Sequence, residues 1–150
     1  MRIPVLSSQG EVKSCRLPSN CDCRIVFSFG ANDTTVENGK RRVEVADSLN
    51  YARQILNLAK HHYPVLMISP APILDAAQNQ RTIDLSQQLA QLCNEISIPY
   101  LDVFTPLSVS TIWIQEVEAG DGAHPDIGGY SEYAQLVQNW SAWMEWFKEF

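Results

Sequence analysis

Short apolar runs alternate with segments of helical spacing along this sequence, and the alternation limits the folds open to it. The runs at 24–29, 64–69 and 98–103 are rich in β-branched and aromatic residues, which is typical of buried strands. Over 43–61 and 82–96, apolar residues recur every three or four positions, which predicts two helices. The order strand, helix, strand, helix, strand predicts an α/β fold in which crossover helices join parallel strands.

The two ends of the chain and one internal segment depart from this alternation. Residues 1–23 show no period and are predicted to be irregular. Residues 104–126 form a long connection, and the last helix is predicted over 127–148, with an aromatic stripe that we expect to pack in the core. The basic run 40–42 is expected to be the solvated start of the first helix. Because no linker or repeat divides the sequence, we expect a single domain over residues 1–150.

Composition limits the class of protein. The 150 residues are 45% hydrophobic and carry a formal net charge of -6, which suits a globular domain and argues against a nucleic-acid surface. No stretch reaches the ~20 apolar residues of a membrane span, and the N-terminal apolar stretch is too short for a signal peptide. The sequence therefore predicts a soluble, cytoplasmic protein, unless a start codon placed too late hides a leader. The tryptophans of the last helix either dock on the domain or a partner subunit, which we favour, or face lipid.

Four cysteines raise the question of a metal site. Cys15, Cys21 and Cys23 lie near the N-terminus, and Cys93 lies alone on a predicted helix. A zinc site usually shows two close cysteine pairs, or a cysteine pair followed by a histidine pair, and the sequence has neither pattern. We therefore expect free thiols and no metal or organic cofactor.

Two short motifs lie where chemistry is expected, beyond the carboxyl ends of parallel strands. The first is Gly30-Ala31-Asn32-Asp33, directly after the first predicted strand. A glycine permits a tight turn there, and the amide of Asn32 can donate a hydrogen bond to an oxyanion. These residue types also make ordinary turns, so this motif alone does not distinguish an oxyanion site from a turn without a catalytic role.

The second motif is Asp121-Gly122-Ala123-His124-Pro125, before the last predicted helix. A carboxylate three residues before an imidazole can orient the ring through Nδ1, which leaves Nε2 of His124 free as a general base and later a general acid. Pro125 restricts His124 to extended backbone conformations, which would help to present the ring. The alternative is a plain loop that leads into the helix, with Asp126 as its N-cap.

Together, in this order and context, the two motifs resemble the GDSL/SGNH hydrolase family over residues 24–150. The resemblance implies a three-layer, flavodoxin-like parallel sheet with flanking helices. It also implies that Asn32 donates to the oxyanion, that His124 is the catalytic histidine, and that Asp121 is its acidic partner. The implied reaction is serine-type hydrolysis of a small-molecule ester or thioester, as in lipases, esterases and acylhydrolases.

One part of the family pattern is absent from the sequence. The family's first block, Gly-Asp-Ser, supplies the nucleophile after the first strand, and no such block precedes Phe29. Ser48 lies inside a predicted helix and after Asn32, Ser7-Ser8 has no Gly-Asp before it, and Ser69 follows the wrong strand. We therefore expect the family's N-terminal strands to be missing or replaced and the nucleophilic serine to lie outside these residues.

These observations leave three readings of function and one structural question. The chain is a serine ester hydrolase whose serine comes from elsewhere, a non-catalytic descendant that binds a small acyl or sugar-like ligand, or, least favoured, a general α/β binding domain. The strand at 24–29 would have a bare edge without the family's first two strands. Either residues 1–10 supply a substitute strand, or the chain forms a homo-oligomer through the exposed sheet edge.

Overall fold

A parallel sheet of three strands lies at the centre of the computed structural model, which describes residues 2–6, 12–16 and 21–148. The strands are β3 (Ile25–Ser28), β6 (Val65–Ile68) and β7 (Tyr100–Leu101), in the order β3-β6-β7. All four residues of β6 are buried, as expected for a central strand covered on both faces. The predicted α/β fold with parallel strands is confirmed.

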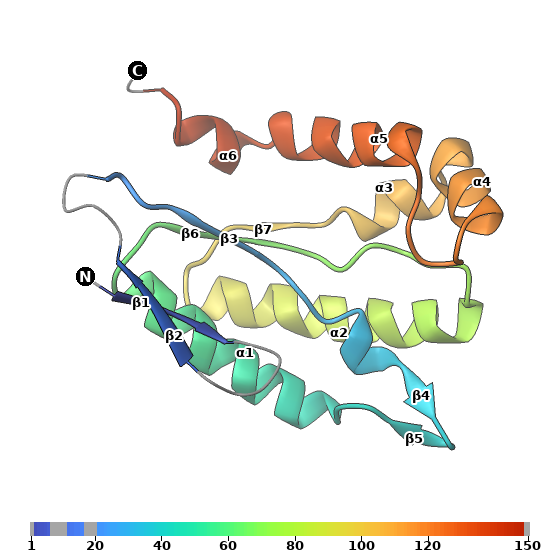
Figure 1. Cartoon of the computed structure of the whole chain (residues 1–150), viewed down its shortest axis with the longest axis horizontal. Helices are drawn as coiled ribbons and strands as arrows, with labels where there is room; N and C mark the ends of the chain where they lie inside the picture. Colours follow the sequence, from blue (N-terminus) through green and yellow to red (C-terminus); the bar gives the residue numbers. More distant parts are fainter. Residues whose placement is uncertain (1, 7–11, 17–20, 149–150) are drawn as a thin grey trace.

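Helices cover both faces of this sheet and make three layers (Figure 1). Helices α1 (Val45–Lys60) and α2 (Ala76–Glu95) lie on one face. Helices α5 (Ile127–Gln138) and α6 (Ser141–Glu145) lie on the other, with α3 (Phe104–Ser108) and α4 (Thr111–Ala119) at one end.

Each interface between layers has its own core. On the α1–α2 side, Leu56, Met67 and Leu85 are almost completely buried together. On the α5 side, Val103 and Trp113 form the centre of the second cluster, with Tyr133 packed against it. Of the aromatic stripe predicted to pack in the core, Tyr133 and Trp140 contact this cluster, whereas Tyr130 and Phe147 are 50% and 54% exposed, so the prediction is confirmed only in part.

The N-terminal region differs from the sequence-based expectation of irregular structure over 1–23. Residues Arg2–Leu6 (β1) and Val12–Arg16 (β2) pair as an antiparallel hairpin. This hairpin is a separate two-stranded sheet, so it does not take the place beside β3. Among the strands that the structure describes, β3 pairs only with β6 and lies at the edge of the parallel sheet.

The basic run 40–42 is not the start of a helix, which corrects our expectation. Residues Lys40–Arg41 form β5, which pairs with β4 (Val36–Glu37) in a second hairpin, and α1 begins only at Val45. The turn residues Asn38 and Gly39 have φ of 53° and 75°, the mirror-image turn that an Asn-Gly pair favours between two strands.

Element boundaries also differ from the prediction in three places. Helix α2 begins at Ala76, six residues before the predicted start at 82. The predicted connection 104–126 contains α3 and α4, and the predicted helix 127–148 is divided between α5 and α6. Within the described residues, none of these helices is both long and apolar enough to cross a membrane.

Candidate active site

The loops that carry the two predicted motifs lie at the same end of the sheet, beyond the carboxyl ends of the strands (Figure 1). The segment that follows β6 contacts both of them. A Cβ placed on Gly30 would lie 3.8 Å from Cγ of Pro70, and the backbone N–H of Leu74 donates to the carbonyl of Gly122 at 2.8 Å. The structure thus brings the Asn32 loop and the Asp121–His124 loop onto one segment.

Gly30 is the residue that lets the chain turn sharply after β3. Its φ is +115°, a conformation that other residues rarely adopt, and it is buried. A Cβ here would lie 3.4 Å from Leu85 and 3.5 Å from Leu89, so little free space surrounds it. The chain then enters η1 (Asn32–Thr34), a short 3₁₀ turn.

Three polar side chains from the start of α2 hold the η1 turn. Gln78 Nε2 donates to the carbonyl of Ala31 at 3.0 Å, and Arg81 Nε donates to the carbonyl of Thr34 at 2.8 Å. The Thr82 hydroxyl lies 2.9 Å from the buried Thr34 hydroxyl. These residues occupy positions i, i+3 and i+4, so they project from one face of the helix. Sequence analysis missed them because they carry no motif, and the spacing is their only signal.

Within this turn, Asn32 and Asp33 have different surroundings. The side chain of Asp33 accepts a hydrogen bond from the Ser48 hydroxyl of α1 at 2.8 Å. Asn32 is exposed, and its amide makes no hydrogen bond to the described residues. The amide that the resemblance assigns to the oxyanion is thus on a turn fixed by its neighbours and is itself free to donate.

Asp121 and His124 form a direct pair in the loop between α4 and α5. Nδ1 of His124 lies 2.8 Å from Oδ2 of Asp121. Oδ1 of the same carboxylate accepts the backbone N–H groups of Ala123 at 2.9 Å and His124 at 2.8 Å. Nε2 of His124 makes no hydrogen bond to the described residues, so the ring is oriented at one nitrogen and free at the other.

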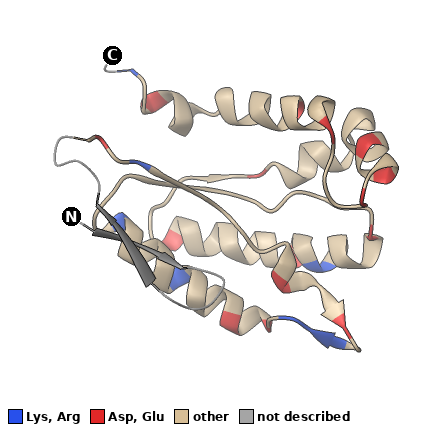
Figure 2. Ribbon diagram, viewed as in Figure 1, with Lys and Arg blue, Asp and Glu red and all other residues tan. Residues whose placement is uncertain are grey.

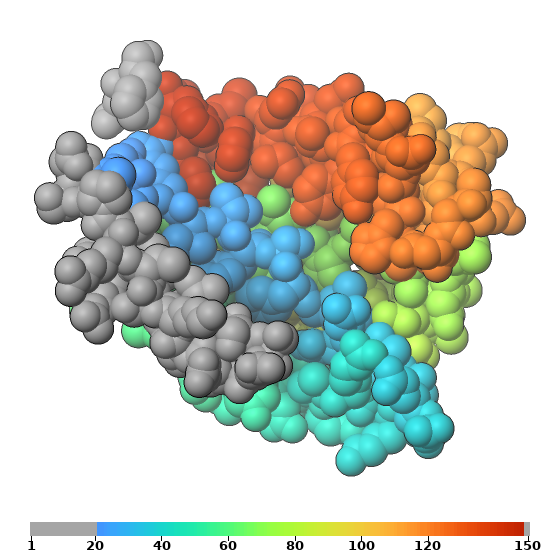
Figure 3. All heavy atoms as spheres, viewed as in Figure 1, coloured from blue at the N-terminus to red at the C-terminus, as the bar shows by residue number. Residues whose placement is uncertain are grey.

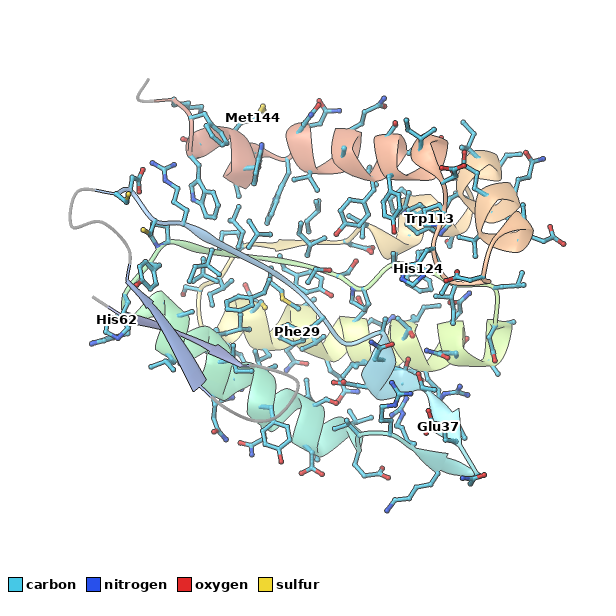
Figure 4. The ribbon with its side chains drawn as sticks, viewed as in Figure 1. Phe29, Glu37, His62, Trp113, His124 and Met144 are labelled. Carbon is cyan, nitrogen blue, oxygen red and sulfur yellow. The ribbon has the colours of Figure 1, made fainter. Side chains whose placement is uncertain are left out.

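The hydrogen bonds to Asp121 have an electrostatic consequence. The His124 ring, followed by the two backbone N–H groups, holds the pKa of the Asp121 carboxyl far below its usual range. The carboxylate is therefore ionised at neutral pH and accepts a hydrogen bond from the Nδ1–H group of His124. Figure 4 shows His124 on the loop between α4 and α5.

The backbone of this loop is held by its neighbours on both sides. Gly122 has φ +82°, and its N–H donates to the carbonyl of Val117 at 3.1 Å. Its carbonyl accepts from Leu74, as described above. Pro125 is buried, so the residue after His124 is fixed by packing. Figure 2 shows that acidic residues lie on α4 and in this loop, while the Lys and Arg residues lie on other segments.

The structure gives two of the four rejected serines structural roles. Ser69 is fully buried, and its hydroxyl accepts the N–H groups of Val103 at 2.9 Å and Phe104 at 3.2 Å. Ser48 is buried on α1 and bonded to Asp33. Ser7 and Ser8 lie outside the described residues. Within the described chain, no serine hydroxyl is hydrogen-bonded to His124.

A cavity of about 210 Å³ lies between the β6–α2 connection and α4. Its walls include Pro72, Leu74, Trp113 and Val117, and the indole N–H of Trp113 donates to the carbonyl of Pro72 at 3.0 Å. Leu74 joins this cavity to the His124 loop, because a Cβ on Gly122 would lie 3.6 Å from Cβ of Leu74. The cavity is apolar enough to accept a small hydrocarbon group.

No metal centre is evident in the part of the chain that the structure describes. Residues 21–148 contain no group of three or more His, Cys, Asp or Glu side chains that could hold an ion. Cys21 and Cys23 are free thiols near the surface. Cys93 is buried in the core, where burial raises the pKa of its thiol to about 11.

Comparison with solved structures identifies the same fold. A GDSL-like lipase from Bacteroides thetaiotaomicron superposes with a TM-score of 0.61 at 19% identity, over 77% of this chain and 60% of that chain. A protein from Bacteroides fragilis described as an acylhydrolase superposes with a TM-score of 0.60 at 21% identity, over 75% of this chain and 58% of that chain. The chain therefore spans about 60% of the length of the structures that it resembles.

Comparison with curated proteins finds no match. The family model described as GDSL-like Lipase/Acylhydrolase family matches residues 10–131, which is most of the chain and includes Asn32, Asp121 and His124. The chain belongs to the GDSL-like lipase/acylhydrolase family.

Proposed function

We propose that this chain supplies the oxyanion donor and the acid–base pair of a serine-type ester hydrolase. Asn32 would donate to the oxyanion, His124 would transfer protons, and Asp121 would hold the His124 ring. The nucleophilic serine would come from outside the sequence shown. The substrate class is a small-molecule ester or thioester, and the reaction needs no metal or organic cofactor.

The Asp121–His124 pair is the observation that supports this proposal most directly. Asp121 accepts from Nδ1 at 2.8 Å, so Nε2 is left as the basic nitrogen of the neutral ring. The lowered pKa of Asp121 keeps its carboxylate charged while the ring gains and loses a proton. This is the arrangement required of a general base that later acts as a general acid.

In the proposed reaction, the serine oxygen attacks the carbonyl carbon of the substrate while Nε2 of His124 takes its proton. The oxygen of the tetrahedral intermediate receives a hydrogen bond from Asn32. The intermediate collapses to an acyl-enzyme as His124 gives the proton to the leaving alcohol or thiol. Water then attacks the acyl-enzyme, with His124 again as base, and the serine is restored.

Hydrolysis of p-nitrophenyl acetate tests the proposal in two steps. The 150-residue polypeptide by itself is expected to show little or no turnover, because loss of the nucleophile in a triad enzyme lowers the rate by about 10⁶-fold. An in-frame upstream Gly-Asp-Ser block, joined to this chain, is expected to restore turnover that His124→Ala abolishes. His62→Ala is the matched control, because His62 is exposed at the far end of α1.

Two results would contradict the proposal. Robust turnover by the polypeptide alone, lost in His124→Ala, would show that the nucleophile lies within these residues. In the second result, the chain joined to the upstream Gly-Asp-Ser block folds but has the same low activity with His124 as in His124→Ala. That result would show that His124 takes no part in the reaction.

The second candidate function is non-catalytic binding of a small acyl ligand. The 210 Å³ cavity beside the His124 loop favours it, because the cavity needs no serine to accept an apolar group. A stop codon directly upstream of Met1, together with binding of short-chain fatty acids that Val117→Trp blocks, would support this function over catalysis.

A further inference from the structure

The carboxylate of Glu116 joins the end of α4 to the start of α5, on the two sides of the His124 loop. Its Oε1 accepts the N–H of Gly128 at 3.2 Å and its Oε2 accepts the N–H of Gly129 at 2.7 Å. The first N–H groups of a helix have no partner within the helix, so an external acceptor satisfies them. A negative charge at this end of α5 is also favoured by the helix dipole.

Glu116 binds N–H groups at the start of α5 that the N-cap residue Asp126 does not bind. The Asp126 side chain accepts the N–H of Ile127 at 2.8 Å, and Glu116 accepts the next two. The carboxylate that binds Gly128 and Gly129 thus comes from another helix, twelve or thirteen residues earlier in the chain. A cap from the same loop would stabilise α5 alone, whereas this contact also fixes α5 relative to α4.

Neither Gly128 nor Gly129 has room for a side chain in this arrangement. A Cβ on Gly128 would lie 2.5 Å from Oε1 of Glu116 and 2.8 Å from Cγ2 of Ile112. A Cβ on Gly129 would lie 2.5 Å from Cβ of Pro125. Pro125 therefore packs directly on the helix start that Glu116 holds, and Pro125 is the residue after His124.

The other end of the loop depends on the same turn of α4. The backbone carbonyl of Glu116 accepts the N–H of Gly120 at 3.1 Å, and that of Val117 accepts the N–H of Gly122 at 3.1 Å. Asp121 lies between these two glycines. The carbonyls of residues 116–117 thus hold the loop on both sides of Asp121, while the Glu116 side chain holds the helix start after His124.

We propose that Glu116 is a positioning residue for the Asp121–His124 pair, and that Gly128 and Gly129 are the backbone groups through which it acts. The importance of Glu116 for catalysis rests on the proposed function of His124.

The ring tautomer of His124 tests the proposal without any turnover. We would record long-range ¹H–¹⁵N spectra of the three histidine rings in the full chain, at a pH where the rings are neutral. In the unchanged chain, His124 is expected to carry its proton on Nδ1. In Glu116→Ala, we expect a mixture of tautomers and amide exchange on the order of tenfold faster at Gly128 and Gly129. Glu116→Gln keeps an acceptor oxygen and is expected to restore much of the Nδ1–H form.

Glu118→Ala is the matched control, since Glu118 is exposed on the same helix and is expected to leave the tautomer unchanged. In Gly128→Ala, the added Cβ would displace the Glu116 carboxylate while Glu116 itself is unchanged. This substitution provides a second variant if Glu116→Ala does not fold. A higher helix propensity would by itself make Gly128→Ala more stable, whereas we expect it to be less stable and to shift the tautomer of His124. An unchanged tautomer in folded Glu116→Ala or Gly128→Ala would reduce Glu116 to a helix cap and overturn the proposal.

Discussion

Nδ1 of His124 lies 2.8 Å from Oδ2 of Asp121 although 71% of the His124 side chain and 62% of the Asp121 side chain are exposed. Burial therefore does not impose this geometry. The loop imposes it, because Oδ1 of Asp121 is bound by two backbone N–H groups of the same turn. An exposed pair of this kind adds little to global stability, so its loss should alter the chemistry of His124 more than the folding of the chain.

The ionisation of Asp121 gives the first prediction. Its hydrogen bond from His124 is the largest cause of the lowered pKa. We expect the ¹³C carboxyl resonance of Asp121 to titrate well below the ordinary range near pH 4, and His124→Ala to move the midpoint up toward that range. Because the folded pKa is depressed, the stabilisation is present above about pH 4 and is lost as the pH falls through the folded value.

His62→Ala is the control for this titration and should leave the midpoint of Asp121 unchanged. An Asp121 that titrates near pH 4 in the unchanged chain would show that the His124 contact is not formed in solution.

The paired hydroxyls of Thr34 and Thr82 give the second prediction. Thr34 donates to the carbonyl of Ala31 at 2.6 Å and lies 2.9 Å from Thr82, and both threonines are buried. Thr82→Val is expected to lower the free energy of unfolding by about 1 kcal/mol, and Thr34→Val by about 1–3 kcal/mol, because it removes both bonds. Urea denaturation measures these changes. Thr111→Val, at the exposed start of α4, is the control. If Thr34→Val lowered the free energy of unfolding no more than Thr111→Val does, the Thr34 and Thr82 hydroxyls would not form a buried hydrogen-bonded pair.

Strong apolar periodicity made the central part of the fold predictable. Helix α1 (Val45–Lys60) and strand β6 (Val65–Ile68) lie almost where the pattern places them. Helix α2 begins earlier than predicted because its first turns bind through polar groups: Asp75 accepts the N–H of Gln78 at 2.8 Å, and Gln78 then binds Ala31. An apolar pattern cannot report such contacts.

Two local features of the fold have recognisable signals in the sequence. The Asn38-Gly39 pair between short extended segments is a hairpin signal, and Ser110 before Thr111 is a helix N-cap whose side chain accepts the N–H of Trp113. The division between α5 and α6 has no such signal, because the extended Trp140 that separates them is neither glycine nor proline.

The candidate site was predictable only where a motif carries the chemistry. Asp121 and His124 lie together as the spacing suggests, and Asn32 lies on a turn after β3. Glu116 could not be predicted, because its role depends on how α4 meets α5, and both its partners are backbone N–H groups that any sequence would provide.

The buried thiol of Cys93 gives the third prediction. Burial raises its pKa to about 11, so at pH 8 only about one thiol in a thousand is ionised. We expect Cys93 to resist alkylation in the folded chain while Cys21 and Cys23 react, as mass spectrometry of the digested protein would show. Because burial raises the folded pKa of Cys93, the fold keeps its stability below about pH 9, where the thiol is neutral in both states, and loses stability as the pH rises toward about 11. Rapid alkylation of Cys93 without unfolding would place it outside the core.

The outer edge of β3, which pairs with no other strand in the described residues, gives the last prediction, which concerns self-association. Ile25 donates its N–H to Pro64 beside β6, so by alternation along the strand Val26 turns its N–H toward the outer edge. Figure 3 shows atoms of the β3 segment (blue) at the surface beside α5 and α6, and the Val26 side chain is 38% exposed. Such an edge can pair with the same edge of a second copy.

We expect the mass of the 150-residue chain in sedimentation experiments to rise over a roughly hundredfold range of concentration. Val26→Pro removes the outward N–H, keeps the bond from Ile25 to Pro64, and should lower the association. Val26→Thr changes the side chain but keeps the N–H, so it should associate as the unchanged chain does. A chain that stays monomeric throughout, or a Val26→Pro variant that associates equally well, would show that pairing at this edge does not drive self-association.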